Sequence, residues 1–152
     1  MTGVTIGALE YAWPAARGSE GFTLRVDQCA VDVGAQVALR GPSGCGKSTL
    51  LGLISGELEA RRGSLEVLGV QLVGATLTER AEFRGTLVGH VPQNAALIPW
   101  LSTLDNVLLP WRVHHSLPRD PSASARAREL LEALGLADRW TERPGQLSAG
   151  ER

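Results

Sequence analysis

Short runs of apolar and β-branched residues mark the N-terminal part of the chain as strand-forming. Residues 4–9 carry one such run, and residues 23–33 carry another in which apolar and polar positions alternate. Small residues and turn formers fill the segment 14–21 between them, which predicts an exposed loop. The pattern therefore predicts two antiparallel strands joined by that loop.

Two later apolar runs show no polar alternation, as is typical of parallel strands that are buried on both faces. One covers residues 37–39, directly before Gly41, and the other covers residues 87–91. Residues 64–68 resume strand character before Gly69. Since helical segments separate these runs, the sequence predicts an α/β fold in which an antiparallel entry is followed by a parallel core sheet.

A helix from about Gly46 to Ser55 is predicted after the first of these buried runs. Gly56 is positioned to end it, because glycine tolerates the left-handed conformation that often closes a helix. The polar segment 78–84 indicates a second, short helix. The side chains expected to form the buried face of the first helix are Leu50, Leu51, Leu53 and Ile54.

Two more helices are predicted in the second half of the chain. Ser102 opens a capping-box pattern, and Pro110 is expected to end the helix after about two turns. The segment 120–135 begins with an Asp-Pro pair and ends with a glycine, so Leu131 and Leu136 fit the contact of a Schellman turn. The apolar stripe of this helix is expected to be Ala123, Ala127, Leu130, Leu131 and Leu134.

Composition and charge exclude several classes of function. At 152 residues, with 43% apolar and 20% charged residues, the chain fits one soluble globular domain. A net charge of −1 and the lack of a basic cluster argue against nucleic acid as a partner. The sequence has no apolar stretch long enough to cross a bilayer and no signal-peptide pattern, so we expect a cytoplasmic or membrane-peripheral protein.

The segment 41–49 carries the chemistry, because Gly-Pro-Ser-Gly-Cys-Gly-Lys-Ser-Thr matches the phosphate-loop pattern GxxxxGK[ST]. Glycines let backbone N–H groups turn toward phosphates, and the following helix adds the positive end of its dipole. The residues expected to bind the phosphates of ATP are Gly41, Ser43, Gly44, Cys45, Gly46, Lys47, Ser48 and Thr49. The alternative is a glycine-rich turn that binds no ligand.

Three side chains of this loop have separate expected roles. Lys47, the only lysine among fifteen basic residues, is expected to reach the β- and γ-phosphates. The hydroxyl of Ser48 is expected to ligate Mg²⁺, and the Thr49 hydroxyl is placed for the α- and β-phosphates. Cys45 is interpreted as a small filler at a permissive position rather than as a catalytic thiol.

Two further segments make the chain resemble the ATPase subunits of ABC transporters over essentially its whole length. Gln93 follows a predicted buried strand, as does the Q-loop glutamine of that family. Residues 147–151, Leu-Ser-Ala-Gly-Glu, look like the LSGGQ signature that distinguishes ABC proteins from other P-loop ATPases. The resemblance implies that Gln93 ligates Mg²⁺ and senses a membrane partner, while a plain loop role for this residue stays open.

The resemblance also implies a second protomer. In the family the signature opens a helix and presents Ser148, the Gly150 backbone and the helix dipole to the γ-phosphate on the opposite protomer. The sequence departs from the pattern at Ala149 and at Glu151, whose charge would face the phosphate if the side chain pointed that way. The signature residues implied by the resemblance are Leu147, Ser148, Ala149, Gly150 and Glu151.

An aromatic ring stacks on adenine in this family, and Trp13 aligns best with it by spacing to the first strands. Tyr11 is the alternative, and ordinary packing stays open for both rings. Residues 94–113 resemble exporters of the lipoprotein-release and macrolide-efflux group, in which this segment receives the coupling helix of a permease. The side chains that either form such a groove or pack the subdomain's own core are Leu97, Ile98, Trp100 and Trp111.

The sequence lacks the groups that hydrolyse ATP in this family, which are an Asp-Glu pair after an apolar strand and a later histidine. The segment most similar to such an apolar strand followed by Asp is residues 134–138, but it is predicted to be the end of a helix and the turn after it. We therefore expect no catalytic residue in this chain and a truncation after the signature. The three histidines, His90, His114 and His115, are expected to be structural or exposed.

The sequence thus predicts a partial ABC ATPase domain with a core of residues 1–93 and a helical subdomain of residues 94–152. We expect a subunit that binds ATP and Mg²⁺, pairs with a second protomer on the inner face of the membrane and powers transport, with export favoured. The alternatives are a soluble ABC ATPase without a membrane partner, an unrelated P-loop kinase, and a nucleotide-binding remnant without hydrolysis.

Overall fold

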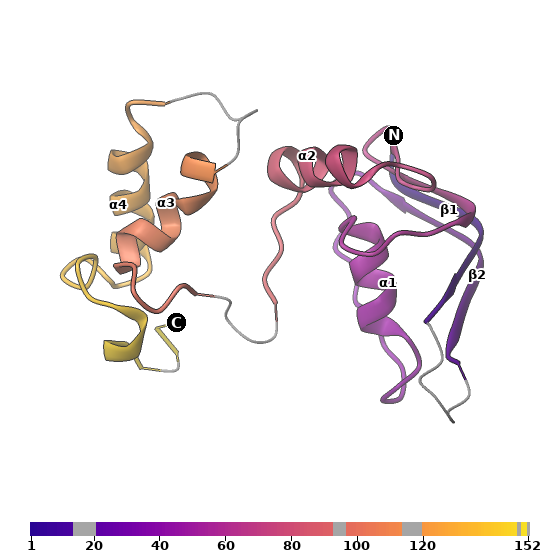
Figure 1. The fold of residues 1–152 in the computed structure, drawn as a ribbon, viewed down its shortest axis with the longest axis horizontal. Coiled ribbons are helices and arrows are strands. Elements are labelled where there is room, and N and C mark those ends of the chain that lie inside the picture. Colours follow the sequence, from indigo (N-terminus) through magenta and orange to yellow (C-terminus); the bar gives the residue numbers. More distant parts are fainter. Residues whose placement is uncertain (14–20, 93–96, 114–119, 149, 152) are drawn as a thin grey trace. The chain divides into compact units, whose positions relative to one another are not determined.

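A computed structural model describes residues 1–13, 21–92, 97–113, 120–148 and 150–151. The chain forms two compact units, Met1–Val88 and Gly89–Arg152 (Figure 1). The domain division predicted at residues 93 and 94 stays a prediction, and the boundary between the compact units follows Val88. Most of the predicted loop 14–21 lies outside the described residues.

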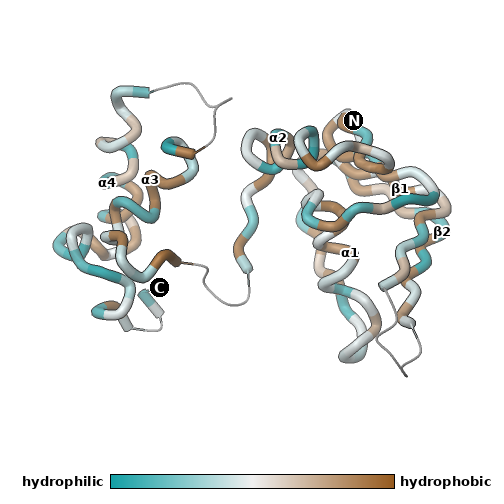
Figure 2. The backbone as a smooth tube through the Cα atoms, viewed as in Figure 1, coloured by the Kyte–Doolittle hydropathy of each residue, from teal (hydrophilic) through white to brown (hydrophobic). Residues whose placement is uncertain are grey.

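Within the described residues, the first unit forms a four-stranded antiparallel sheet with the order β2-β1-β3-β4. Its strands are β1 (Thr2–Ala12), β2 (Thr23–Asp32), β3 (Arg62–Val67) and β4 (Val70–Gln71). In β1, Thr5 pairs with Ala30 of β2 on one side and with Glu66 of β3 on the other. Figure 2 shows hydrophobic and hydrophilic residues mixed along β1 and β2, as expected of a sheet with one covered face. The predicted antiparallel entry is confirmed.

A two-residue turn of Leu68 and Gly69 joins β3 to β4. Both residues have a positive φ, 50° and 82°, as the favoured two-residue hairpin turn requires. The N–H of Leu68 donates to the carbonyl of Gly3 at 2.8 Å, which ties this turn to the start of β1. The strand predicted over residues 64–68 is confirmed, and its last residue belongs to the turn.

Helices α1 (Lys47–Ile54) and α2 (Leu77–Leu87) complete the first unit, and both were predicted. Leu53 of α1 is fully buried, whereas Leu51, which was expected on the same buried face, is 54% exposed. Gly56 has a φ of 73° just after the helix, as predicted for its closing residue. The core that joins helices and sheet consists of Ile6, Leu9, Leu53, Ala60, Leu65, Val67, Leu72 and Phe83.

The two predicted parallel strands are not formed among the described residues, so this part of the prediction is wrong for the chain as described. Residues 37–39 have no strand assignment, and Val37 is 67% exposed. In the second run, Leu87 is the last residue of α2 and Val91 is 92% exposed. A parallel strand is stable only with hydrogen-bonded neighbours and covering layers, and neither run has a ladder partner in the described part of the chain.

The second unit contains α3 (Thr103–Val113), α4 (Ala123–Ala133) and the 3₁₀ turn η1 (Pro144–Gln146). Ser102 caps α3 as predicted, because its hydroxyl accepts from the Asp105 N–H at 3.0 Å and donates to the Asp105 carboxylate at 2.6 Å. The prediction that Pro110 ends α3 is wrong, since the helix continues to Val113. Proline removes one backbone donor but its φ suits a helix, so a short continuation is tolerated at this cost.

Helix α4 ends in the predicted Schellman turn. The Leu136 N–H donates to the Leu131 carbonyl at 2.8 Å, and the Gly135 N–H donates to the Glu132 carbonyl at 2.9 Å. Leu131 and Leu136 are both buried, which confirms the predicted contact pair. Leu130 and Leu134 of the predicted stripe are instead exposed. The core of the second unit is formed by Leu104, Leu108, Ala127, Leu131 and Leu136.

Candidate nucleotide-binding site

The phosphate-loop segment leads directly into α1. Gly46 is the N-cap residue, with a φ of 97° in the left-handed region, and it has no side chain with which to cap the helix. Its carbonyl accepts the N–H of Leu50 at 2.8 Å, which starts the helical hydrogen bonds. The first turn of α1 contains no acidic side chain, so its positive dipole end faces no carboxylate of its own. This is the local arrangement that suits an external anion.

Steric conditions explain why the loop requires glycine at position 46. A Cβ added to Gly46 would lie 2.9 Å from Cζ of Phe22 and 3.0 Å from Cδ1 of Leu24. Gly44 also has a positive φ of 80°, but a Cβ there would meet no atom within 4 Å. Gly44 therefore serves the backbone turn alone, whereas Gly46 also lets the loop approach β2 closely.

The amine of Lys47 lies over the loop from which it projects. Its Nζ donates to the carbonyl of Gly41 at 2.9 Å and to that of Pro42 at 2.7 Å, and lies 3.8 Å from Sγ of Cys45. All three partners belong to the predicted phosphate loop. The ammonium group of Lys47 thus lies at the loop, where it could also donate to phosphate oxygens. The expected contact of Lys47 with the β- and γ-phosphates stays a prediction.

Ser48 and Thr49, which follow in the first turn of α1, differ in exposure. Ser48 is exposed, as its expected role as an Mg²⁺ ligand requires. Thr49 is buried, and its Oγ1 accepts the indole N–H of Trp13 at 3.2 Å. The described residues contain no group of three or more His, Cys, Asp or Glu that could hold a metal. Hydroxyl and amide oxygens, such as the one expected of Ser48, are ligands that suit Mg²⁺.

The two candidate rings for adenine lie in different surroundings. Trp13 is 44% exposed beside Thr49, and its backbone N–H donates to the Phe22 carbonyl at 2.9 Å. Tyr11 is partly buried against the hydrophobic core, and the two rings meet edge to face with centroids 5.4 Å apart. Adenine stacking stays a prediction for Trp13, which is the ring next to the phosphate loop.

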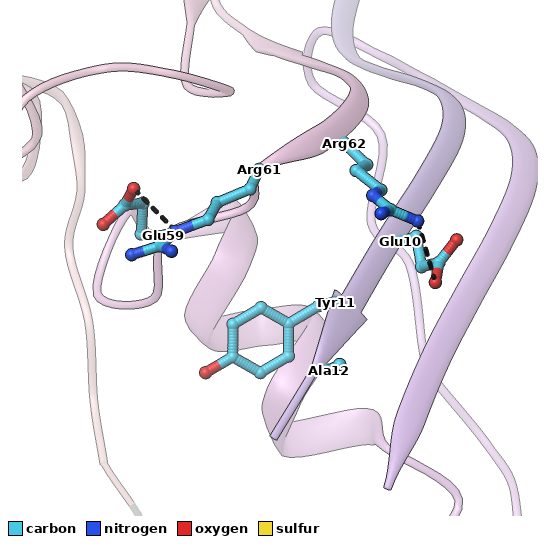
Figure 3. Close-up of a pocket in the computed structure, with 6 residues that line it drawn as sticks. All are labelled: Glu10, Tyr11, Ala12, Glu59, Arg61 and Arg62. Atoms are coloured by element: carbon cyan, nitrogen blue, oxygen red, sulfur yellow. Dashed lines mark hydrogen bonds and ion pairs between the residues drawn. The ribbon is translucent and has the colours of Figure 1, made fainter. Parts of the chain in front are cut away.

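Tyr11 instead lines a cavity of about 530 Å³ with the charged side chains around the end of β1 (Figure 3). Arg61 and Glu59 form an ion pair there at 3.3 Å, and Arg62 lies 3.9 Å from Glu10. These guanidinium groups already have carboxylate partners. The cavity contains none of the predicted phosphate-binding residues, so we assign it no ligand.

In the predicted signature, the Glu151 side chain folds back onto Ser148. Its Oε2 accepts the Ser148 N–H at 2.7 Å. Hydrogen bonds from the Ser148 hydroxyl and backbone N–H lower the pKa of the Glu151 carboxyl, and the charge of Arg139 adds to this. The departure from the family pattern at this position thus gives an anion that caps its own turn. Gly150 is exposed and Leu147 is buried, whereas Ala149 and Gln93 lie outside the described residues.

A cavity of about 210 Å³ in the second unit includes one of the residues predicted for a permease groove, Leu97. Trp100 and Trp111 are both exposed. The sequence interpretation missed Asn106, which also lines this cavity. Its side chain accepts the Ile98 N–H at 2.8 Å and donates to the Ser102 carbonyl at 3.0 Å, so it fixes the segment before α3. No pattern in a single sequence marks such a half-buried amide with several backbone partners.

No helix within the described ranges combines the length and apolar character needed to span a membrane. A mixed α/β arrangement with a glycine-rich loop at the start of α1 is the fold of a P-loop NTPase. The sequence profile of the ABC transporter family matches residues 24–152. The chain therefore belongs to the ABC transporter family.

Relatives and solved structures agree with this assignment. The lipoprotein-releasing system ATP-binding protein LolD of Rhodopseudomonas palustris is 44% identical over 81% of this chain and 52% of that protein. An uncharacterised ABC transporter ATP-binding protein of Mycobacterium tuberculosis is 38% identical over 88% of this chain and 41% of that protein. The ATP-binding cassette MJ0796, solved as a dimer bound to ADP and Pi, aligns with a TM-score of 0.85 at 27% identity, covering 97% of this chain and 64% of that chain.

The chain spans about half the length of these curated relatives. The resemblance to the ATP-binding proteins of ABC transporters is confirmed, and with it the α/β fold of ABC type. The relatives include several that carry the name of the lipoprotein-releasing system, which was the exporter group expected from residues 94–113.

Proposed function

We propose that this chain is the nucleotide-binding part of an ABC transporter ATPase subunit and that it binds ATP with Mg²⁺. The observation that carries the proposal is the start of α1, where Gly46 leaves the helix without a capping side chain and Lys47 lies over the loop. Such a turn offers N–H donors and a positive dipole to phosphate oxygens. The neighbour MJ0796 was solved with ADP and Pi, which supports the same ligand class here.

Within this proposal each residue has one task. Lys47 contacts the β- and γ-phosphates, while the exposed hydroxyl of Ser48 and the side chain of Gln93 ligate Mg²⁺. Thr49 lies against the α- and β-phosphates, and Trp13 stacks on the adenine. When bound, Mg²⁺ would neutralise part of the phosphate charge. The proposal for this chain is nucleotide binding, and no residue of the chain is proposed as catalytic.

Two partners follow from the relatives. A second ATPase protomer would place its phosphate loop opposite residues 147–151, and MJ0796 was solved as a dimer. A membrane permease would contact residues 94–113, where Trp100 and Trp111 are exposed. The names of the lipoprotein-releasing relatives support export as the direction of transport. The protein would then work on the inner face of the membrane.

Titration of MgATP into the chain, followed by calorimetry, tests the nucleotide site. We expect Lys47→Ala to weaken binding by about tenfold or more, because a charge-assisted contact to phosphate is lost. Arg40→Ala is the matched control, because Arg40 is an exposed cation directly before the loop. Equal affinity in the wild type and Lys47→Ala would reject the proposal, and so would equal losses in the two variants.

A further inference from the structure

Neither end of α1 is stabilised by a side chain of the helix's own sequence. At its N-terminus, Gly46 provides no capping side chain. At its C-terminus the last turn contains no basic residue, although the exposed carbonyls there form the negative end of the dipole. A short helix with neither kind of support depends on tertiary contacts.

Two arginines of α2 bind the turn that follows the C-terminal end of α1. Arg80 donates from NH1 to the carbonyls of Gly56 at 3.2 Å and of Glu57 at 3.3 Å. Arg84 also donates from NH1 to the Gly56 carbonyl. Gly56 and Glu57 follow the C-cap residue Ser55, so these carbonyls belong to the turn directly after α1. Both guanidinium groups therefore anchor the turn that follows the C-terminal end of α1.

Arg80 is the more unusual of the two because it is almost completely buried, with 6% of its surface exposed. Its Nε donates to the Ala75 carbonyl at 3.4 Å, and its NH2 lies 3.8 Å from the Glu59 carboxylate. Burying a guanidinium is costly unless its donors are satisfied, and here Nε and NH1 donate to carbonyls while NH2 lies in the ion pair with Glu59. The fork geometry of arginine makes this possible, and a lysine amine could not reach the same set of acceptors.

The same region is also closely packed. A Cβ on Gly56 would lie 3.2 Å from Cδ1 of Phe83, a buried residue of α2. The chain therefore turns sharply after α1 with α2 pressed against the turn. Arg80 and Arg84 hold this contact by polar bonds, and Phe83 holds it by apolar packing.

We propose that Arg80 is a positioning residue for the nucleotide site, acting with Arg84 to hold the C-terminal end of α1. The inference rests on the proposed function. The backbone N–H groups at the N-terminus of α1 would bind the nucleotide. The position of α1 is therefore fixed by contacts at its other end, where Arg80 and Arg84 bind the turn after the helix. Loosening that end lets α1 shift along its axis, and the phosphate loop moves with it.

The test compares Arg80→Met with Arg61→Met in binding of MgATP and of inorganic tripolyphosphate. Arg61 pairs with the same Glu59 but is exposed, so it controls for loss of one cation near that carboxylate. We expect Arg80→Met to weaken both ligands equally, by about tenfold, because it removes hydrogen bonds from a buried charged group. We expect the affinity of Arg61→Met to stay within about twofold of the wild type.

Hydrogen exchange separates positioning from general destabilisation. In Arg80→Met we expect faster exchange of the α1 amides, with β1 amides unchanged at a temperature where circular dichroism shows the variant folded. If Arg80→Met does not fold, Arg80→Lys and Arg84→Met replace it, with the same expected pattern. A folded variant that binds tripolyphosphate as tightly as the wild type would overturn the inference. If the wild type binds neither ligand, the proposed function fails first.

Discussion

The indole Nε1 of Trp13 donates a hydrogen bond to Oγ1 of Thr49 at 3.2 Å. This bond joins a residue just after β1 to the first turn of α1, across 36 positions of sequence. The ring proposed for the base is thus tied directly to the loop proposed for the phosphates. Tyr11, the other candidate ring, meets the edge of Trp13 and does not supply this bond.

Trp13→Phe keeps an aromatic ring and removes the N–H donor. We expect ATP affinity to fall by about threefold, because one ordinary hydrogen bond that orients the ring is lost. Tripolyphosphate has no base, so its affinity should not change. The measurement is a competition titration with both ligands.

Tyr11→Phe is the control for Trp13→Phe, because it removes a phenol hydroxyl and leaves the Trp13 bond intact. Its affinity for ATP should match that of the wild type. An equal loss of ATP and tripolyphosphate affinity in Trp13→Phe would show that the ring supports the loop and not the base.

Gly46→Ala and Gly44→Ala separate two reasons for glycine in the loop, which are the positive φ and the lack of space for a side chain. Both substitutions force alanine into a positive φ, which costs about 1–2 kcal/mol of unfolding free energy. Only the Cβ at position 46 also meets the Phe22 ring, at 2.9 Å, and overpacking adds about 1–3 kcal/mol. Urea unfolding followed by circular dichroism should therefore find Gly46→Ala the less stable variant. Equal unfolding free energies would show that the Phe22 ring moves aside without cost.

Features set by neighbouring residues were predictable from the sequence. The antiparallel strands, both helices of the first unit and the Schellman turn at Gly135 follow from periodicity and from glycine positions. The failures concern segments whose structure depends on distant partners. Residues 37–39 read as a buried strand, yet a strand needs a ladder partner, and none lies in the described residues.

The candidate site divides in the same way. The glycines and Lys47 were identified from the spacing of one motif. The hydrogen bonds from Arg80 to the carbonyls after α1 join residues more than twenty positions apart in the sequence. Arginine is usually exposed, and no local sequence pattern indicates that this one is buried. The direction of Glu151 was open from the sequence, and it was decided by a hydrogen bond within its own turn.

Glu151 leads to the last prediction, which concerns pH. Its carboxyl accepts hydrogen bonds from the Ser148 hydroxyl and backbone N–H, and these lower its pKa below the usual glutamate range. A carboxylate with a lowered folded-state pKa stabilises its turn above the unfolded pKa, and this contribution is lost as pH falls through the folded pKa. The amide chemical shift of Ser148, followed by NMR from pH 7 downward, should therefore titrate with a midpoint below that of an ordinary glutamate.

Two variants make this titration specific. Glu151→Gln cannot ionise, so the acid titration of the Ser148 amide should disappear in it. Arg139→Gln removes the nearby positive charge that assists the carboxylate, so the midpoint should move upward while the titration persists. A midpoint at or above the ordinary glutamate range in the wild type would mean that the carboxylate does not bind Ser148 in solution. The signature turn would then be left uncapped, and its N–H groups would be open to phosphate without competition from the chain's own anion.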